Sequence, residues 1–483
     1  MKPKKETFFG GARTSRRAIL KAGAATGASV AVGVASARPA FAAGTTETGR
    51  SYDAIVIGGG FAGVSAAREL KARGKRTLIL EARNRVGGRA WSSTFSGLPI
   101  EFGATWIHPS QTLIWNEVQR LGIARVDDPN PDFAVFATES GSYAKQELTF
   151  LDQQDALLRR FVEGAETYLP RAYDPFYRED LLVDLDKLTL GDRARQLRLS
   201  DLEMNWVSAT TGAYGGGFER GSLTQLAHWW ALCGYNTETF HGINVTRPVG
   251  GMSNVISRML AESGASVVYN APVTKVTDSG SRVQVTANGV VYDAAAVVVA
   301  VPVNTWNSIN FTSGLPAEFS RLSTQTVGVP TAKKVFIQVQ GDIGRPLMNG
   351  KSGAMLDLVL AHADKSAQGT VLIGFSVNPN LDVTSVSQVQ SAVSELLPGT
   401  KVLSVKGHDW GKDAYAKGGW TFRTPGQLLG SLRAVRQPHG RLVFAGSDIA
   451  TGWGGYVDGA IETGVRAAGL AAGLTAAAAS ATS

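Results

Sequence analysis

Apolar residues fall in short runs along the chain that predict alternating strands and helices. Asp53–Ile57 and Thr77–Leu80 have the length and the β-branched content of buried strands, and the Ala-rich segment Val64–Arg73 between them predicts a helix. Further strands are predicted at 266–269, 282–286, 335–339 and 371–377, and further helices at 388–397 and 456–472. This alternation predicts an α/β fold.

A glycine-rich turn, Gly58-Gly59-Gly60-Phe61-Ala62-Gly63, follows the first strand and has the pattern G-x-G-x-x-G. Gly58 permits a tight turn, Gly60 lets a pyrophosphate approach the backbone, and Gly63 lets the helix pack closely on the strand. Glu81 ends the second strand, where a carboxylate can accept hydrogen bonds from ribose hydroxyls. The unit predicts a dinucleotide site, which NAD and FAD use alike.

Several further segments resemble those of one known family. Arg85-Val86-Gly87-Gly88-Arg89 follows Glu81 closely, and two longer segments lie near the other end at 441–448 and 452–464. Between them come 102–108, 248–252, 272–273, 300–302 and Lys334, in the order found in the family. The chain resembles the flavin-containing amine oxidases, the monoamine and polyamine oxidase superfamily. Within it, the chain is most similar to the branch of bacterial nicotine and pseudooxynicotine oxidases.

The resemblance implies FAD as the cofactor and a Rossmann-like FAD-binding domain interleaved with an α+β substrate-binding domain. The FAD-binding pieces are expected at 50–125, 245–305 and 425–475, and the substrate-binding pieces at 126–244, which reads as helix-rich, and 306–424. The residues expected to contact FAD are Gly58, Gly60, Phe61, Ala62, Gly63, Glu81, Ala82, Arg83, Gly88, Arg89, Gly103, Ala104, Thr105, Trp106, Val273, Gly446, Asp448, Tyr456 and Val457. The N-terminus of the helix that begins near Tyr456 carries partial positive charge, which would stabilise an anionic reduced flavin.

The same resemblance implies four residues on the substrate side. Trp420 and Tyr456 match an aromatic pair that holds the amine, although two ordinary core aromatics would give the same pattern. Lys334 matches a lysine that reaches flavin N5 through a water, and Lys333 is expected to be its outward, solvated neighbour. His108 either touches the substrate or ends a strand beside the flavin. The implied reaction is oxidation of an amine to an imine by hydride transfer to flavin N5, followed by hydrolysis to a carbonyl product.

Two departures from relatives refine this expectation. Members that bind flavin covalently have Cys just before the first aromatic of the pair, where this chain has Gly419, so FAD should be non-covalent. Amino-acid oxidases carry an Arg near the Gly103–Thr105 turn, where this chain has Trp106, so a carboxylate substrate is disfavoured. An L-amino-acid oxidase, a polyamine oxidase and a flavoprotein that only binds a partner remain the alternatives. Oxygen or a cytochrome-type carrier would accept the electrons, and a homodimer is compatible with the sequence.

Composition excludes several other classes. The formal net charge is +8, but residues 1–42 hold eight of the 48 basic residues and one of the 40 acidic ones. The nearly neutral remainder has no basic run for nucleic acid. Cys233 is the single cysteine, and the six His show no metal-binding pattern, so we expect neither disulfides nor a metal site.

Residues 1–42 read as an export signal. Arg16-Arg17 is a twin-arginine pair. The Ala/Gly/Val-rich run that follows it is too short, and its residues are too weakly apolar, to span a membrane. Ala40-Phe41-Ala42 is a small-residue cleavage pattern. The twin-arginine route carries folded proteins, commonly with their cofactor, so we expect a periplasmic or secreted holoprotein with no membrane span.

Replacing Arg16 and Arg17 by Lys should leave a folded, flavin-loaded precursor in the cytoplasm, because only the export signal is damaged. Cell fractionation followed by flavin fluorescence measures this. Normal accumulation of the variant outside the cytoplasm would contradict the prediction.

Overall fold

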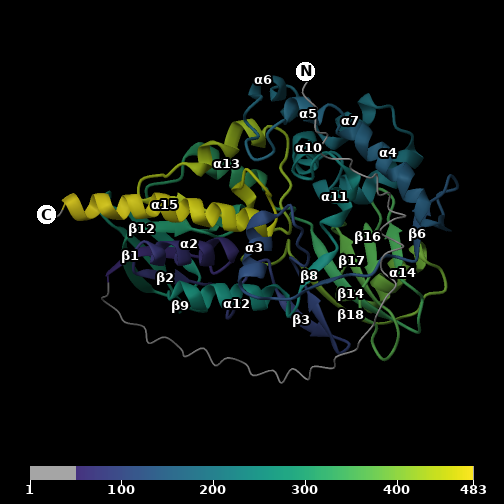
Figure 1. Ribbon diagram of the computed structural model, residues 1–483, viewed down its shortest axis with the longest axis horizontal. Coiled ribbons are helices and arrows are strands. Elements are labelled where there is room, and N and C mark those ends of the chain that lie inside the picture. The colour runs from purple at the N-terminus through teal and green to yellow at the C-terminus, as the bar shows by residue number, and fades with distance from the viewer. Residues whose placement is uncertain (1–50, 482–483) are drawn as a thin grey trace, which may run out of the picture. The chain divides into compact units, whose positions relative to one another are not determined.

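Two β-sheets organise the part of the chain that the structure, a computed structural model, describes, which is residues 51–481 (Figure 1). Side chains are described as far as Ala476. The export signal predicted at residues 1–42 lies outside the described residues.

The first sheet is parallel on one side and antiparallel on the other. Its order is β13-β10-β11-β12-β1-β2-β9, and β19 pairs with the second half of β12. β12 pairs in parallel with β1 and β19 and antiparallel with β11, so it joins the two parts. The strands are β1 (Ser51–Ile57), β2 (Thr77–Leu80), β9 (Ser266–Val268), β10 (Val273–Asp278), β11 (Val283–Ala287), β12 (Val290–Val299), β13 (Asn310–Phe311) and β19 (Leu442–Phe444).

Both faces of the parallel part are buried. Ala54 and Val56 of β1 pack in one core with three helices, α2 (Phe61–Ala72), α12 (Gly251–Ser263) and α15 (Val457–Ala481), which Figure 1 shows on that side of the sheet. Ile55 and Ile57 point to the opposite face and join the larger core. Alternation of side chains along a strand therefore produces the continuous apolar run that the sequence shows.

The second sheet has seven strands in the order β18-β14-β17-β16-β15-β6-β7. They are β6 (Phe133–Ala137), β7 (Tyr143–Gln146), β14 (Lys333–Val339), β15 (Pro346–Asn349), β16 (Leu358–Ala361), β17 (Val371–Ser376) and β18 (Val402–Asp409). One face packs on α14 (Val386–Leu396) through Val335 and Ile337. Between these two residues Phe336 points to the opposite face of the sheet, where its ring packs against Phe102.

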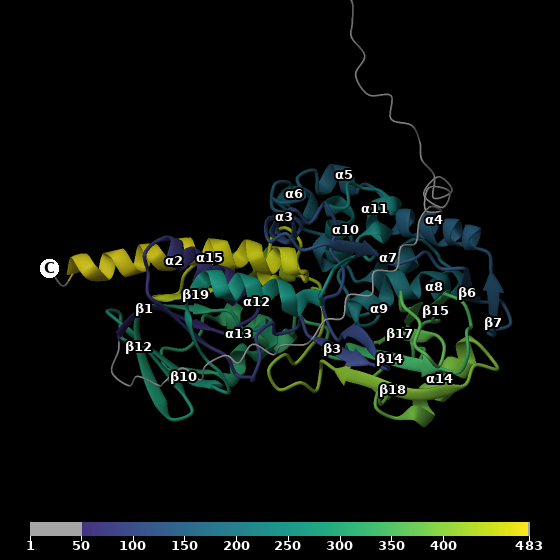
Figure 2. The same cartoon turned by 60° about the horizontal axis from the view of Figure 1, so that its bottom comes forward.

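Short helices gather over the second sheet (Figure 2). They are α4 (Leu151–Phe161), α5 (Ala165–Tyr168), α6 (Glu179–Leu182), α7 (Leu190–Gln196), α8 (Asp201–Val207), α9 (Gly212–Gly215), α10 (Leu223–Leu232) and α11 (Thr237–Gly242). Outside this group lie α3 (Thr112–Arg120), α13 (Ala317–Gln325) and two small antiparallel pairs, β3 (Ser92–Phe95) with β4 (Leu98–Glu101) and β5 (Arg125–Asp127) with β8 (Thr246–Pro248).

The predicted elements correspond to observed ones with small changes at their ends. The helix predicted at 64–73 begins three residues earlier, and the one predicted at 456–472 runs on to Ala481. The reading of 126–244 as helix-rich misses β6 and β7, the two strands at one end of the second sheet. The predicted α/β fold is confirmed.

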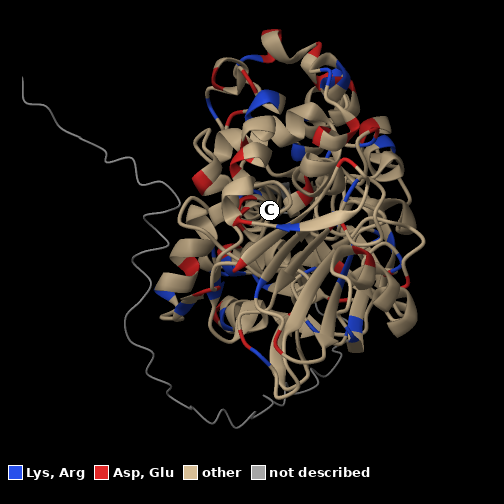
Figure 3. Ribbon diagram, turned by 90° about the vertical axis from the view of Figure 1, so that its right-hand side faces the viewer, with Lys and Arg blue, Asp and Glu red and all other residues tan. Residues whose placement is uncertain are grey.

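Charged residues of both signs are interspersed along the described chain (Figure 3). Within residues 51–481 no helix is both long and apolar enough to cross a membrane. The same residues contain no cluster of three or more His, Cys, Asp or Glu that could hold a metal ion.

Candidate active site

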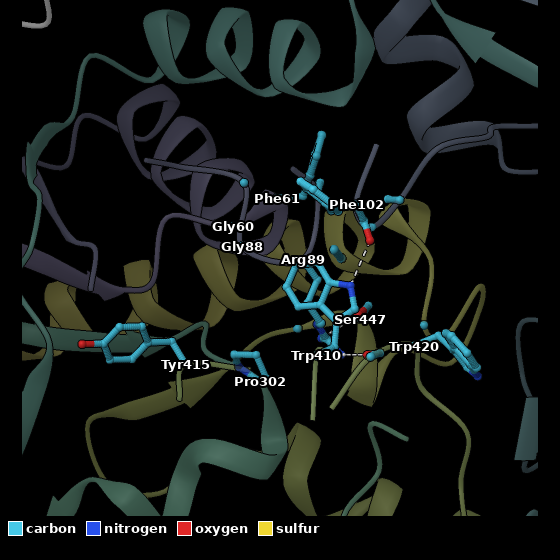
Figure 4. A pocket seen from close by; sticks show the side chains of 18 of the residues that line it. Gly60, Phe61, Gly88, Arg89, Phe102, Pro302, Trp410, Tyr415, Trp420 and Ser447 are labelled. Carbon is cyan, nitrogen blue, oxygen red and sulfur yellow. Dashed lines mark hydrogen bonds between the residues drawn. The ribbon is translucent and has the colours of Figure 1, made fainter. Parts of the chain in front are cut away.

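A cavity of about 470 Å³ lies between the two sheets, and both supply its walls. This volume is within the range of small-molecule and cofactor sites. The glycine-rich turn after β1 lines one part, and β14, β16 and β17 line another. Figure 4 shows Gly60, Arg89, Pro302 and Trp420 around it.

Most of the predicted residues line this single cavity. On the cofactor side these are Gly58, Gly60, Phe61, Ala62, Glu81, Ala82, Arg83, Gly88, Arg89, Gly103, Ala104, Thr105, Trp106, Val273, Gly446 and Val457. On the substrate side they are Lys334, Trp420 and Tyr456. Segments that are far apart in the sequence therefore meet at one cavity.

The glycines of the glycine-rich turn have different surroundings. Gly58 and Gly63 pack tightly against backbone, whereas Gly60 faces open space. Gly58 has φ +102°, and a Cβ on Gly63 would lie 2.0 Å from the Gly58 carbonyl oxygen. A Cβ on Gly60 would meet nothing closer than the Gly87 carbonyl oxygen at 4.0 Å. Gly60 is also the N-cap of α2, and no side chain caps this helix. The free N–H groups of the first turn therefore face a space that suits a phosphate.

Glu81 is a buried carboxylate that braces the turn. Its Oε2 accepts a hydrogen bond from the Gly59 amide at 2.7 Å, and Oε1 accepts one from the Arg83 amide at 2.8 Å. Burial raises the pKa of Glu81, and the two amides oppose that shift. Each oxygen keeps a lone pair for a further donor in the cavity, such as a ribose hydroxyl.

An ion pair between Arg89 and Asp448 joins segments of the cavity wall between the proposed cofactor and substrate sides. The guanidinium of Arg89 donates to Asp448 Oδ1 at 2.7 Å and to the Gly419 carbonyl oxygen at 2.8 Å. Asp448 Oδ2 accepts from the Val303 amide at 3.0 Å, and the side-chain exposure of Asp448 is 1%. Asp448, predicted to contact FAD, does not itself line the cavity, and its side chain contacts Arg89, which does.

The start of α15 meets the cavity through Gly455 and Tyr456, which precede the helix, and through Val457 and Ala460 in its first turn. Asp458, also in this turn, turns away, because its Oδ1 accepts from the Leu113 and Ile114 amides at 2.7 and 3.0 Å. The positive end of the helix therefore faces the cavity.

Trp420 and Tyr456 form an aromatic wall. The Trp420 indole donates to the Tyr214 carbonyl oxygen at 2.9 Å, and its ring packs edge-on against Phe375. Tyr456 packs edge-on against Trp229 with ring centroids 5.5 Å apart. Burial raises the pKa of the Tyr456 phenol well above its ordinary value, so it stays neutral.

Lys334 points into the cavity from β14 and is almost fully buried. Its Nζ donates to Thr105 Oγ1 at 2.7 Å and to the Gly103 carbonyl oxygen at 3.2 Å. Burial lowers the pKa of Lys334 to about 7, although Glu101 and Asp128 oppose this shift.

Lys333 does not have the solvated position predicted for it. Its exposure is 2%, and its Nζ donates to the Asn378 carbonyl oxygen. The strand is buried on both faces, so neither of the paired lysines reaches solvent.

Two further predicted residues lie outside the cavity lining. Gly63 packs against the turn, as the Gly58 contact requires. His108 is half-buried, and its Nδ1 pairs with Ser110 Oγ at 2.8 Å. His108 therefore takes no place in the cavity wall.

Several lining residues escape sequence reasoning. They include Tyr214, Trp229, Asp357, Leu358, Leu360 and Phe375. Leu358 and Phe375 face each other across β16 and β17, and Phe375 pairs in register with Lys334. Asp357 is an isolated acid between apolar neighbours, which is a usable signal, whereas Tyr214 and Trp229 have none.

Comparison with known proteins agrees with this geometry. Residues 61–472 match the family model described as flavin containing amine oxidoreductase. The chain belongs to this family. Its relatives include pseudooxynicotine dehydrogenase of Pseudomonas sp, 33% identical over 93% of this chain and 94% of that one. Nicotine dehydrogenase of Pseudomonas putida is also 33% identical, over 94% and 96%. The predicted likeness to this branch of the flavin-containing amine oxidoreductases is confirmed.

Solved structures share the fold of this amine oxidoreductase. Putrescine oxidase superposes with a TM-score of 0.74 at 23% identity, over 87% of this chain and 98% of that one. Cyclohexylamine oxidase from Brevibacterium oxydans gives 0.71 at 22%, over 88% and 99%. Family membership shows that the protein is a flavin-containing enzyme that acts on amines. The open space at Gly60 and the bracing carboxylate of Glu81 fit a flavin dinucleotide.

Gly60→Val tests the phosphate cradle. The new side chain has room in the cofactor-free protein, where the backbone at Gly60 has φ −77°, so the chain should fold while flavin occupancy falls at least about tenfold. Flavin absorbance per protein and far-UV circular dichroism measure the two effects. Gly469→Val, on the exposed side of α15 with nothing within 4 Å, is the matched control. Full flavin content in Gly60→Val would contradict this placement.

Proposed function

We propose that the enzyme binds FAD non-covalently and oxidises an amine to an imine, which water hydrolyses to a carbonyl product. The observation that carries the proposal is the shared cavity, because the phosphate cradle at Gly60 and the Trp420–Tyr456 wall line the same space as Lys334. When bound, the flavin supplies the two-electron oxidation of the C–N bond.

The cofactor would be held mainly by residues of the first sheet and the last helix. The turn at Gly60 would take the pyrophosphate, Glu81 a ribose, and the first turn of α15 the redox-active ring. We propose accordingly that 50–125, 245–305 and 425–475 form the FAD-binding domain. In support, the strands of the first sheet come from these pieces, apart from the two-residue β13. The pieces at 126–244 and 306–424 supply the second sheet and the short helices, and we assign these to substrate binding.

The aromatic wall would position the amine and exclude water. Trp420 is anchored by its indole hydrogen bond to Tyr214 and by Phe375, so its ring presents a fixed face. Aromatic faces attract a partly positive nitrogen and its neighbouring C–H groups. A neutral amine would therefore be held with its α-carbon in a fixed place, and positioning of this kind contributes much of the rate.

Lys334 would accept and donate a proton near the reacting nitrogen. Thr105 and Gly103 hold its Nζ at the cavity wall, and its pKa of about 7 lets it carry or release a proton near neutrality. A buried amine of this kind favours a neutral substrate, because a second positive charge beside it would be repelled.

The cavity does not favour an amino-acid substrate. Its two lining arginines, Arg83 and Arg89, lie near the cofactor turn and pair with Asp413 and Asp448. On the substrate side stands Asp357, an acid, which would repel an α-carboxylate. Plain amines are therefore the proposed substrates, ahead of L-amino acids.

We also propose that the enzyme is exported and that a cytochrome-type carrier reoxidises its flavin. The twin-arginine pair supports a periplasmic or secreted enzyme. Two relatives at 33% identity are named dehydrogenases, which favours a cytochrome-type acceptor over oxygen.

Acid precipitation should release all of the FAD into the supernatant. A Cβ on Gly419 would lie 2.5 Å from the Ala332 Cβ, so no thiol-bearing residue fits there, and the buried Cys233 does not line the cavity. Absorbance of the pellet and supernatant measures this. Yellow colour that stays with the pellet would mean a covalent link.

Trp420→Ala separates chemistry from packing. Loss of the fixed ring should slow flavin reduction by the amine at least tenfold, and by about 100-fold if the α-carbon shifts by roughly 1 Å, while FAD stays bound. Anaerobic stopped-flow absorbance measures the rate. Trp115→Ala, a half-buried Trp of α3 outside the cavity, is the control. Loss of FAD or of folding in Trp420→Ala alone would make Trp420 a core aromatic, and an unchanged rate would assign the wall to other residues.

A further inference from the structure

Asp357 is a carboxylate at the substrate end of the cavity that the proposed reaction does not use. It lies just before β16, its exposure is 4%, and it lines the cavity of about 470 Å³. It also lines a second cavity of about 180 Å³, together with Ala213 and Val377, which line both. The carboxylate thus belongs to the wall that the two cavities share.

The backbone around Asp357 fixes its position. The Asp357 amide donates to the Phe375 carbonyl oxygen at 2.9 Å, and its own carbonyl oxygen accepts from the Gly350 amide at 2.8 Å. The Val377 amide donates to Asp357 Oδ2 at 2.7 Å. The carboxylate therefore has a defined orientation before any ligand arrives.

No basic partner neutralises this carboxylate among residues 51–476, whose side chains the structure describes. No Lys, Arg or His of these residues forms an ion pair with Asp357, and none of their donors hydrogen-bonds to its Oδ1. Burial accordingly raises the pKa of Asp357 to about 7, opposed by the Val377 amide. A buried carboxylate without a cation is costly, and a cationic ligand would relieve that cost.

The separation from the reacting site fits one substrate molecule. Leu358, next to Asp357, stands in the same cross-strand row as Phe375 and Lys334. Two strand spacings separate Leu358 from Lys334, which is roughly 10 Å at about 4.8 Å per strand. Leu358, Leu360 and Phe375 line the cavity over this stretch with apolar surface. The row suits a short carbon chain with a polar group at each end.

We propose that Asp357 is a specificity-determining residue that binds a second, protonated nitrogen of the substrate, remote from the nitrogen that is oxidised. The preferred substrates are then diamines rather than monoamines. This inference rests on the proposed amine oxidation at Trp420 and Tyr456.

The test compares α,ω-diamines of three to six carbons with alkyl monoamines of the same lengths. Dissociation constants are measured by calorimetry on the dithionite-reduced holoenzyme without oxygen, where no turnover occurs. At least one diamine should bind about tenfold more tightly than its monoamine, as a charge-assisted hydrogen bond supplies. Asp357→Asn should abolish that preference and change monoamine affinity less than about twofold, because the amide oxygen can still accept from Val377.

Asp364→Asn is the matched control, since it removes the same charge from an exposed position after β16 that lines neither cavity. It should keep the preference for diamines. The inference is overturned if no diamine binds the wild-type enzyme more tightly than its monoamine, a comparison that needs no variant. It is also overturned if Asp357→Asn weakens both classes equally. If no amine of either class reduces the wild-type flavin, the proposed function fails instead, and the binding preference shows separately whether Asp357 recognises a cation.

Discussion

The buried carboxylate of Asp448 holds together the segments that make the active-site cavity. It accepts hydrogen bonds from Arg89, Thr421 and the Val303 amide, which come from three distant parts of the chain. Burial alone would raise the pKa of Asp448, but Arg89 and these donors hold it below its ordinary value. Removing one partner of a buried pair costs about 3–5 kcal/mol, so this carboxylate must stay ionised and paired for the site to persist. Arg89 extends the connection to the Gly419 carbonyl oxygen, directly before Trp420. The cofactor side and the substrate side therefore keep a fixed relation.

The two ends of the cavity differ in their chemistry because different elements supply them. At the first sheet, backbone amides and the braced carboxylate of Glu81 suit phosphate and ribose. At the second sheet, rows of apolar side chains leave Lys334 and Asp357 as the charged groups of the wall. Lys334 has hydrogen-bond acceptors in Thr105 and Gly103, whereas among the side chains and backbone that the structure describes the Asp357 carboxylate has only the Val377 amide as a donor. A substrate that brings its own positive charge would complete the wall at Asp357.

Sequence reasoning predicts the local parts of this molecule well. The strand, glycine-rich turn and helix around Gly60 follow from short-range patterns and lie where those patterns place them. Positions tied to a motif, such as Trp420 and Tyr456, also reach the cavity. What the sequence does not reveal depends on long-range pairing. β6 joins the second sheet by pairing with β15, about 200 positions later in the chain, and β7 is the edge strand that pairs with β6. Lys333 is buried because both faces of β14 are covered. Tyr214 and Asp357 become lining residues only when α9 and β16 meet across the cavity.

The proposed reaction requires that a flavin in this cavity receives electrons from an amine held at the second sheet. Anaerobic titration of the wild-type holoenzyme with plain amines, followed by flavin absorbance, tests this most directly. The yellow absorption should bleach stoichiometrically with amines and not with the corresponding α-amino acids. A flavoprotein that stays yellow with every amine, or that bleaches only with α-amino acids, would contradict the account.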